Sequence, residues 1–157
     1  MSRRPAAPFA SDALLLGRVT YEGFKAAWPA MADDPADTVG FGKRMNALPK
    51  YVATRSLATP DWNATFLPGD AVEAVARLRE DPGTGTLLVN GSGVLLRALI
   101  ADDLVDELRV MLYPVLVGKG ARLFAEEDET LRSWTLREHR ISASGVAILF
   151  YEPARSA

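Results

Sequence analysis

The sequence predicts an α/β protein with a mostly parallel sheet, flanking helices and an antiparallel pair of strands at its end. Two observations predict this class. From Ala13 to Ile100, short apolar runs alternate with helix-like segments, and such alternation is typical of parallel strands joined by helices. From Arg109 onward the regular segments are all strand-like, which favours an antiparallel edge.

Length and composition are consistent with one domain. The chain has 157 residues, of which 48% are hydrophobic, so it is long enough to bury one sizeable core. We predict a flexible tail over residues 1–10 and a single domain over residues 11–157. The 18 basic and 20 acidic side chains leave a formal net charge of −2, which gives no electrostatic basis for binding nucleic acid or an anionic membrane.

The chain has no cysteine, so disulfides, thiolate metal sites and cysteine nucleophiles are excluded. The two arginines near the start, Arg3 and Arg4, are followed by no apolar signal segment. The longest apolar runs, such as Val110 to Val117, are too short to span a bilayer. We therefore expect a cytoplasmic protein that has neither a membrane nor a nucleic-acid partner.

In the first half of the chain the elements follow from apolar runs and from proline. The run from Ala13 to Val19 predicts a strand buried on both faces. Thr20 is a plausible N-cap for a short helix that Pro29 ends. We predict strands at 13–19, 50–54 and 63–67, helices at 21–28 and 41–48, and a loop at 30–40.

In the second half, Asp70 caps a helix with a clear apolar stripe formed by Val72, Val75, Ala76 and Leu78. Pro82 and two glycines end this helix. The remaining predicted elements are a strand at 86–89, a helix at 94–100, a strand at 109–117 interrupted at Pro114, and a closing hairpin of residues 134–141 and 146–152.

The first candidate site is Gly17-Arg18-Val19-Thr20, where a buried strand gives way to a helix. Open α/β sheets bind ligands at the carboxyl ends of their strands. Amide groups at a helix start attract phosphate, and the guanidinium of Arg18 adds a charge-assisted donor. The motif alone fits an ordinary turn better, with a solvated arginine and a capping threonine.

The second candidate site, Asn90-Gly91-Ser92-Gly93-Val94, also joins a strand to a helix. The two glycines allow a pyrophosphate to approach the backbone amides, because no Cβ blocks it. Leu96 stands where the third glycine of the full dinucleotide-binding fingerprint would be, so this pattern is weak alone. Its pairing with the first motif strengthens it.

The third candidate, Thr54-Arg55-Ser56, ends a strand. One guanidinium and two hydroxyl groups suit the 2′-phosphate that distinguishes NADPH from NADH, although a polar loop is the simpler interpretation. The only histidine, His139, is more consistent with a structural role than a catalytic one, and the acidic run at 126–129 reads as a solvated face. We predict no metal site and assign no catalytic residue.

Taken in order, these segments resemble the dihydrofolate-reductase-like family that contains the C-terminal reductase domain of the riboflavin-biosynthesis protein RibD. The matching segments are ALLLGRVTYEGF (13–24), KYVATRS (50–56), LLVNGSGVLLRALI (87–100) and DELRVMLYPVLVGKGARLF (106–124). The last is the most specific for the RibD type. The resemblance implies a three-layer fold with a mixed central sheet.

The resemblance also implies an NADPH-dependent reductase that transfers hydride to a small heterocycle similar to a pterin or a riboflavin precursor. It implies that the NADPH phosphates meet Gly17, Arg18 and Thr20, that Thr54, Arg55 and Ser56 lie near the 2′-phosphate, and that Gly91, Ser92, Gly93 and Val94 pack on the pyrophosphate. The alternatives are a catalytically degenerate member that binds nucleotides or dimerises, and a flavin- or nucleotide-binding module of another doubly wound type.

Family members normally begin with a strand, a Ser-Leu-Asp-Gly loop and a helix, whereas only twelve residues precede Ala13. A truncated gene start, loss of activity or a partner chain that supplies the strand would each explain this difference. We also expect a homodimer, because Val110 to Val117 and the closing hairpin are apolar and strand-like and suit pairing across a two-fold axis.

Overall fold

The computed structural model describes residues 10–124 and 130–154. The chain divides into two compact units, Met1–Ala98 and Leu99–Ala157, and each unit is described by itself. The predicted tail lies outside the described residues except for Ala10, and the acidic run at 126–129 lies outside them entirely. The assignment of a single domain to residues 11–157 stays a prediction.

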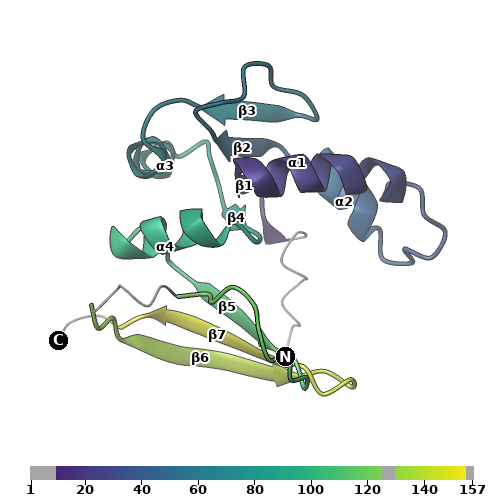
Figure 1. Cartoon of the computed structure of the whole chain (residues 1–157), viewed down its shortest axis with the longest axis vertical. Coiled ribbons are helices and arrows are strands. Elements are labelled where there is room, and N and C mark those ends of the chain that lie inside the picture. Colours follow the sequence, from purple (N-terminus) through teal and green to yellow (C-terminus); the bar gives the residue numbers. More distant parts are fainter. Residues whose placement is uncertain (1–9, 125–129, 155–157) are drawn as a thin grey trace. The chain divides into compact units, whose positions relative to one another are not determined.

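The first unit is built on a four-stranded parallel sheet with the order β3-β2-β1-β4. Its strands are β1 (Ala13–Gly17), β2 (Lys50–Ala53), β3 (Ala64–Leu67) and β4 (Leu87–Val89). Figure 1 shows α1 (Arg18–Ala27) and α2 (Phe41–Ala47) on one side of this sheet and α3 (Ala71–Glu80) on the other. The predicted α/β class is confirmed.

The core of this unit lies around β1, as its continuous apolar run predicts. Leu14, Leu15 and Leu16 are each at most 1% exposed, because neighbouring strands and layers on both faces enclose them. On the side of Leu14 and Leu16, the core continues through Tyr21, Met45, Leu48 and Val52. This packing fixes the carboxyl end of β1.

The helix starts test the capping predictions. Asp70 caps α3 as predicted, since its Oδ1 accepts hydrogen bonds from the amides of Val72 and Glu73 at 2.9 and 3.2 Å. The prediction that Thr20 caps the first helix is wrong, because α1 begins at Arg18 with Gly17 as its N-cap. Beyond these helices the chain forms a short 3-10 helix η2 (Pro29–Met31) and α4 (Gly93–Ala101).

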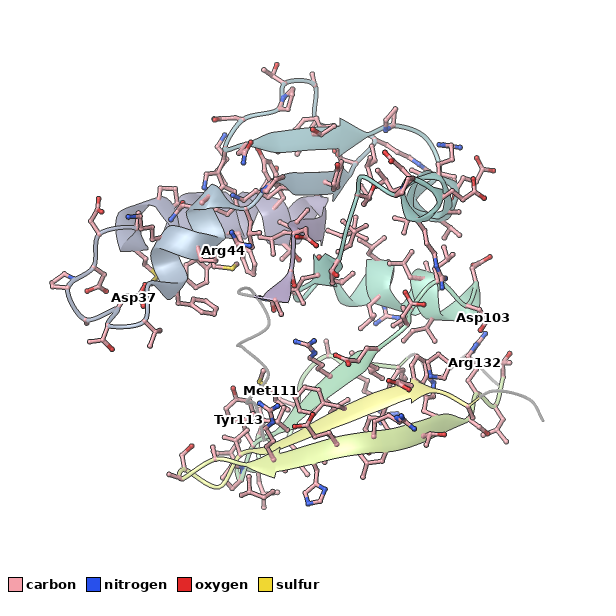
Figure 2. All side chains as sticks on the ribbon, turned by 180° about the vertical axis from the view of Figure 1, so that it is seen from behind. Asp37, Arg44, Asp103, Met111, Tyr113 and Arg132 are labelled. Carbon is pink, nitrogen blue, oxygen red and sulfur yellow. The ribbon has the colours of Figure 1, made fainter. Side chains whose placement is uncertain are left out.

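The second unit contains a three-stranded antiparallel sheet with the order β5-β7-β6. It consists of β5 (Leu108–Leu112), β6 (Trp134–Ile141) and β7 (Ala147–Pro153), and the predicted closing hairpin is confirmed. The prediction that β5 continues to Val117 is wrong, since the strand ends two residues before Pro114, which has no amide hydrogen to donate to a ladder. Figure 2 labels Met111 and Tyr113 at this end of β5.

Candidate functional site

Parallel strands bring the three predicted segments to one edge of the first sheet. The register pairs Gly17 of β1 with Ala53 of β2, and Leu15 of β1 with Val89 of β4. The carboxyl ends of these strands therefore lie in a row, with neighbouring strands about 4.8 Å apart. Along this row follow Thr54-Arg55-Ser56, then Gly17-Arg18, then Gly91-Ser92-Gly93. The row is called the carboxyl-edge row below.

Hydroxyl groups join the two glycine turns of this row. The Gly17 amide donates to Ser92 Oγ at 2.9 Å, and the Ser92 amide donates to Thr20 Oγ1 at 3.1 Å. Thr20 therefore does not cap α1 but accepts from the neighbouring turn. These two amides already have partners within the chain, so other groups of the turns must receive a phosphate.

The backbone of the β4–α4 turn has an unusual conformation. Gly91 has a φ of 73° and Ser92 has a φ of 54°. The left-handed region costs glycine little but is uncommon for serine. The pair of hydrogen bonds made by Ser92 holds it in this conformation. Strained residues of this kind concentrate at ligand-binding sites, so the geometry supports a binding role for this turn.

The start of α1 keeps the features that favour an anion. Its N-cap, Gly17, has no side chain and no acidic residue lies in its first turn, so within the described residues the positive end of the helix dipole has no carboxylate from that turn beside it. The first turn of α4 also has no acidic residue. Val19 and Val94, at these helix starts, are 70% and 76% exposed and offer apolar contact area to a ligand.

Arg18 contacts Glu22 rather than the turns. Its Nη1 donates to Glu22 Oε2 at 2.8 Å, and both side chains are 46% exposed. Exposed pairs of this type contribute only about 0.3–0.5 kcal/mol. Arg18 is therefore free to exchange Glu22 for a phosphate at small cost.

The third segment lines a pocket. Thr54 Oγ1 accepts hydrogen bonds from the amides of Ser56 and Leu57 at 3.3 and 3.2 Å, so this hydroxyl group shapes the turn. A cavity of about 610 Å³ lies beside it. It is lined by Thr54, Arg55, Leu57, Ala58, Pro60, Ala64, Thr65, Phe66, Pro68 and Gly69. One guanidinium at a largely apolar pocket suits an aromatic ligand that carries negative charge.

The side of this pocket that β3 supplies was not predicted from the sequence. Ala53 pairs with Leu67, so the residues after β3 lie next to Arg55 in the carboxyl-edge row. Arg55 Nε is 3.5 Å from the Gly69 carbonyl oxygen. The parallel pairing of two consecutive strands was the signal that could have found these residues.

The other candidates lie outside this site. His139 is exposed on β6. Among residues 10–124 and 130–154, no group of three or more histidine, cysteine, aspartate or glutamate side chains is arranged to hold a metal ion. No helix within these ranges has both the length and the apolar character needed to cross a membrane.

The first unit is an α/β fold whose parallel strands end in a row of turns, and comparison with known proteins identifies the family of the chain. The model of the RibD C-terminal domain family matches residues 9–149, so the chain belongs to that family. YyaP of Bacillus subtilis (strain 168), an uncharacterized protein, is 27% identical over 140 residues, which cover 89% of this chain and 73% of YyaP.

Solved structures have the same fold. A putative riboflavin biosynthesis protein from Shewanella sp. PV-4 matches with a TM-score of 0.72 and 22% identity, covering 94% of this chain and 77% of that one. RibD from Acinetobacter baumannii matches with a TM-score of 0.64 and 14% identity, covering 92% of this chain and 47% of that one. The family supports a reductase-type role, and the solved structures support the fold.

Proposed function

We propose that the chain binds NADPH along the carboxyl-edge row and reduces a small heterocycle similar to a pterin or a riboflavin precursor. The observation that carries this proposal is the convergence of three separate segments, around residues 17, 55 and 92, at one edge of a parallel sheet. A pocket with a guanidinium lies at one end of the row. Membership of the RibD C-terminal domain family supports the same reaction class.

The residues present fit such a cofactor. The first amides of α1 and the turn at Gly91-Ser92-Gly93 would receive the pyrophosphate, and the exposed side chain of Val94 would pack beside it. The cavity beside Phe66 would hold the adenine, and Arg55 would pair with the 2′-phosphate. NADPH supplies the hydride when bound, and the chain contributes orientation and charge.

Replacing Arg18 by alanine is expected to weaken NADPH binding by about 10- to 100-fold, since a hydrogen bond to a charged group contributes about 1.5–3 kcal/mol. Fluorescence titration of NADPH measures this change. Arg77→Ala is the matched control, because Arg77 pairs with Glu73 four residues away on α3, as Arg18 pairs with Glu22 on α1. Absence of NADPH binding, or equal affinity of wild type and Arg18→Ala, would contradict the proposed function.

A non-catalytic nucleotide-binding role is the second candidate. Within the described residues β4 pairs with β1 alone, so the carboxyl-edge row ends at the Gly91-Ser92-Gly93 turn and no further parallel strand adds residues to a substrate site. This arrangement favours nucleotide binding without catalysis. Steady consumption of NADPH in the presence of a pterin, a flavin precursor or a deaminated pyrimidine would exclude this candidate. Binding of NADPH without consumption on any of these substrates would favour it.

We also propose that the chain forms a homodimer through the second unit. Val115, Leu116 and Val117 are 64%, 104% and 77% exposed, and contiguous exposed apolar residues are typical of interaction sites. Light scattering at micromolar concentration is expected to give twice the chain mass of 17.0 kDa. Leu116→Asp should shift the mass toward the monomer, whereas Val39→Asp, an exposed position in the first unit, should not. A wild-type monomer would contradict this prediction.

A further inference from the structure

Asp70 brings a negative charge to the guanidinium that lines the pocket. Asp70 follows β3 and Arg55 follows β2, and these two strands pair in parallel. Asp70 Oδ2 is 3.9 Å from Arg55 Nη2, while Asp70 Oδ1 accepts the amides of Val72 and Glu73. One carboxylate thus caps α3 and faces Arg55.

The two functions of this carboxylate differ in strength. The capping hydrogen bonds fix the position of Asp70 at the start of α3. The ion pair with Arg55 is weak, because the separation is long and the side chains of Arg55 and Asp70 are 79% and 51% exposed. An incoming phosphate can therefore replace Asp70 as the partner of Arg55, but the capped carboxylate stays nearby.

We propose that Asp70 is a specificity-determining residue that limits the preference for a 2′-phosphorylated adenosine over an unphosphorylated one. This inference rests on the proposed function, in which Arg55 receives the 2′-phosphate. A phosphate that pairs with Arg55 would share this guanidinium with the Asp70 carboxylate, so Asp70 would repel its roughly two negative charges and also compete for Arg55. The preference for the phosphorylated ligand is therefore lower than Arg55 alone would give.

Asp70→Asn tests this inference because asparagine caps a helix as well as aspartate does while it removes the charge. The probes are adenosine 2′,5′-bisphosphate and adenosine 5′-monophosphate, which differ only in the 2′-phosphate, and calorimetric titration measures their affinities. Affinity for the bisphosphate should rise about three- to tenfold at low salt, and this gain should shrink as salt approaches about 0.5 M. Affinity for the monophosphate should stay unchanged.

Asp81→Asn is the matched control. Asp81 lies at the other end of α3, and its Oδ1 accepts the amide of Gly83 at 2.8 Å, an interaction that asparagine preserves. This variant removes the same charge from the same helix and should leave both affinities unchanged. If Asp81→Asn raises the affinity for the bisphosphate as much as Asp70→Asn does, the gain comes from the change in net charge, and the proposed role of Asp70 is wrong.

The outcomes separate the two proposals. If wild type binds NADPH but Asp70→Asn leaves the ratio of the two affinities unchanged or lowers it, the role of Asp70 is wrong and the proposed function stands. If wild type binds neither NADPH nor the bisphosphate, the proposed function fails, and the specificity role fails with it.

Discussion

Replacing Lys50 by methionine is expected to raise the free energy of unfolding at neutral pH by about 1–3 kcal/mol. Lys50 opens β2, and its side chain is only 1% exposed. Burial lowers the pKa of its amine from 10.5 to about 8. Each pKa unit corresponds to about 1.4 kcal/mol, so keeping this amine protonated costs the folded state roughly 3 kcal/mol.

Two contacts offset part of that cost. Lys50 Nζ donates to the Asn46 carbonyl oxygen at 2.7 Å and lies 4.0 Å from the ring centroid of Trp62. A cation–π contact contributes about 0.5–2 kcal/mol. Among the described residues no carboxylate forms an ion pair with Lys50. Methionine is an unbranched, uncharged side chain one heavy atom shorter than lysine, although it leaves the Asn46 carbonyl without this donor.

The pH dependence identifies the cause of the gain. Since the pKa in the folded state is about 8 and that of an ordinary lysine is 10.5, the unfolded state binds more protons within this interval. Wild-type stability therefore gains a rising contribution between about pH 8 and 10.5. The methionine variant has no such contribution, so its advantage over wild type should shrink across the same interval.

Urea denaturation at several pH values, followed by circular dichroism, measures both effects. Lys43→Met is the control, because Lys43 lies exposed on α2 and its loss should change stability by less than about 0.5 kcal/mol at each pH. An advantage of Lys50→Met that stays constant up to about pH 10 would show that desolvation of the charge is not its source.

Local signals in the sequence were sufficient to predict most elements and the three segments that form the carboxyl-edge row. The apolar run at Leu14, Leu15 and Leu16 identified β1, and the capping pattern at Asp70 identified the start of α3, because both depend on neighbours in sequence. The row followed from topology, since parallel strands separated by helices end at one edge of a sheet. The assignment of its residues to NADPH remains a prediction.

Features that depend on distant parts of the chain were not predictable in this way. Threonine is a favoured N-cap residue, but the hydroxyl of Thr20 accepts a hydrogen bond from the amide of Ser92, which is 72 residues away. The approach of Asp70 to Arg55 depends on how β2 and β3 pair. Likewise, the parallel strands form one sheet and the antiparallel strands form another. The pattern of apolar residues predicts the strands but not which of them pair.

The close packing of α2 is a further feature of this kind, and it gives the second large expected effect. Gly42→Ala is expected to lower the free energy of unfolding by about 2–4 kcal/mol. Gly42 is buried in α2, and a Cβ added there would lie 2.1 Å from the carbonyl oxygen of Met31 in η2. The obstacle is backbone, so a rotamer change cannot relieve the clash.

The helix would have to move away from η2, and this movement would disturb two regions. Met45 and Leu48, which follow on the same segment, are at most 1% exposed in the core. The Gly42 amide also donates to Asp37 Oδ2 at 2.6 Å. Hydrogen bonds from the backbone amides of Phe41 and then Gly42 lower the pKa of the Asp37 carboxyl, which Figure 2 labels in the loop before α2.

Gly23→Ala is the matched control for this substitution. Gly23 lies within α1, and an added Cβ would meet no atom within 4 Å. Alanine at an open helical position should therefore stabilise the protein by about 0.5–1 kcal/mol. The midpoints of urea denaturation should move in opposite directions for the two variants. If Gly42→Ala unfolds at the same urea concentration as wild type, α2 does not pack against the backbone of η2 in solution.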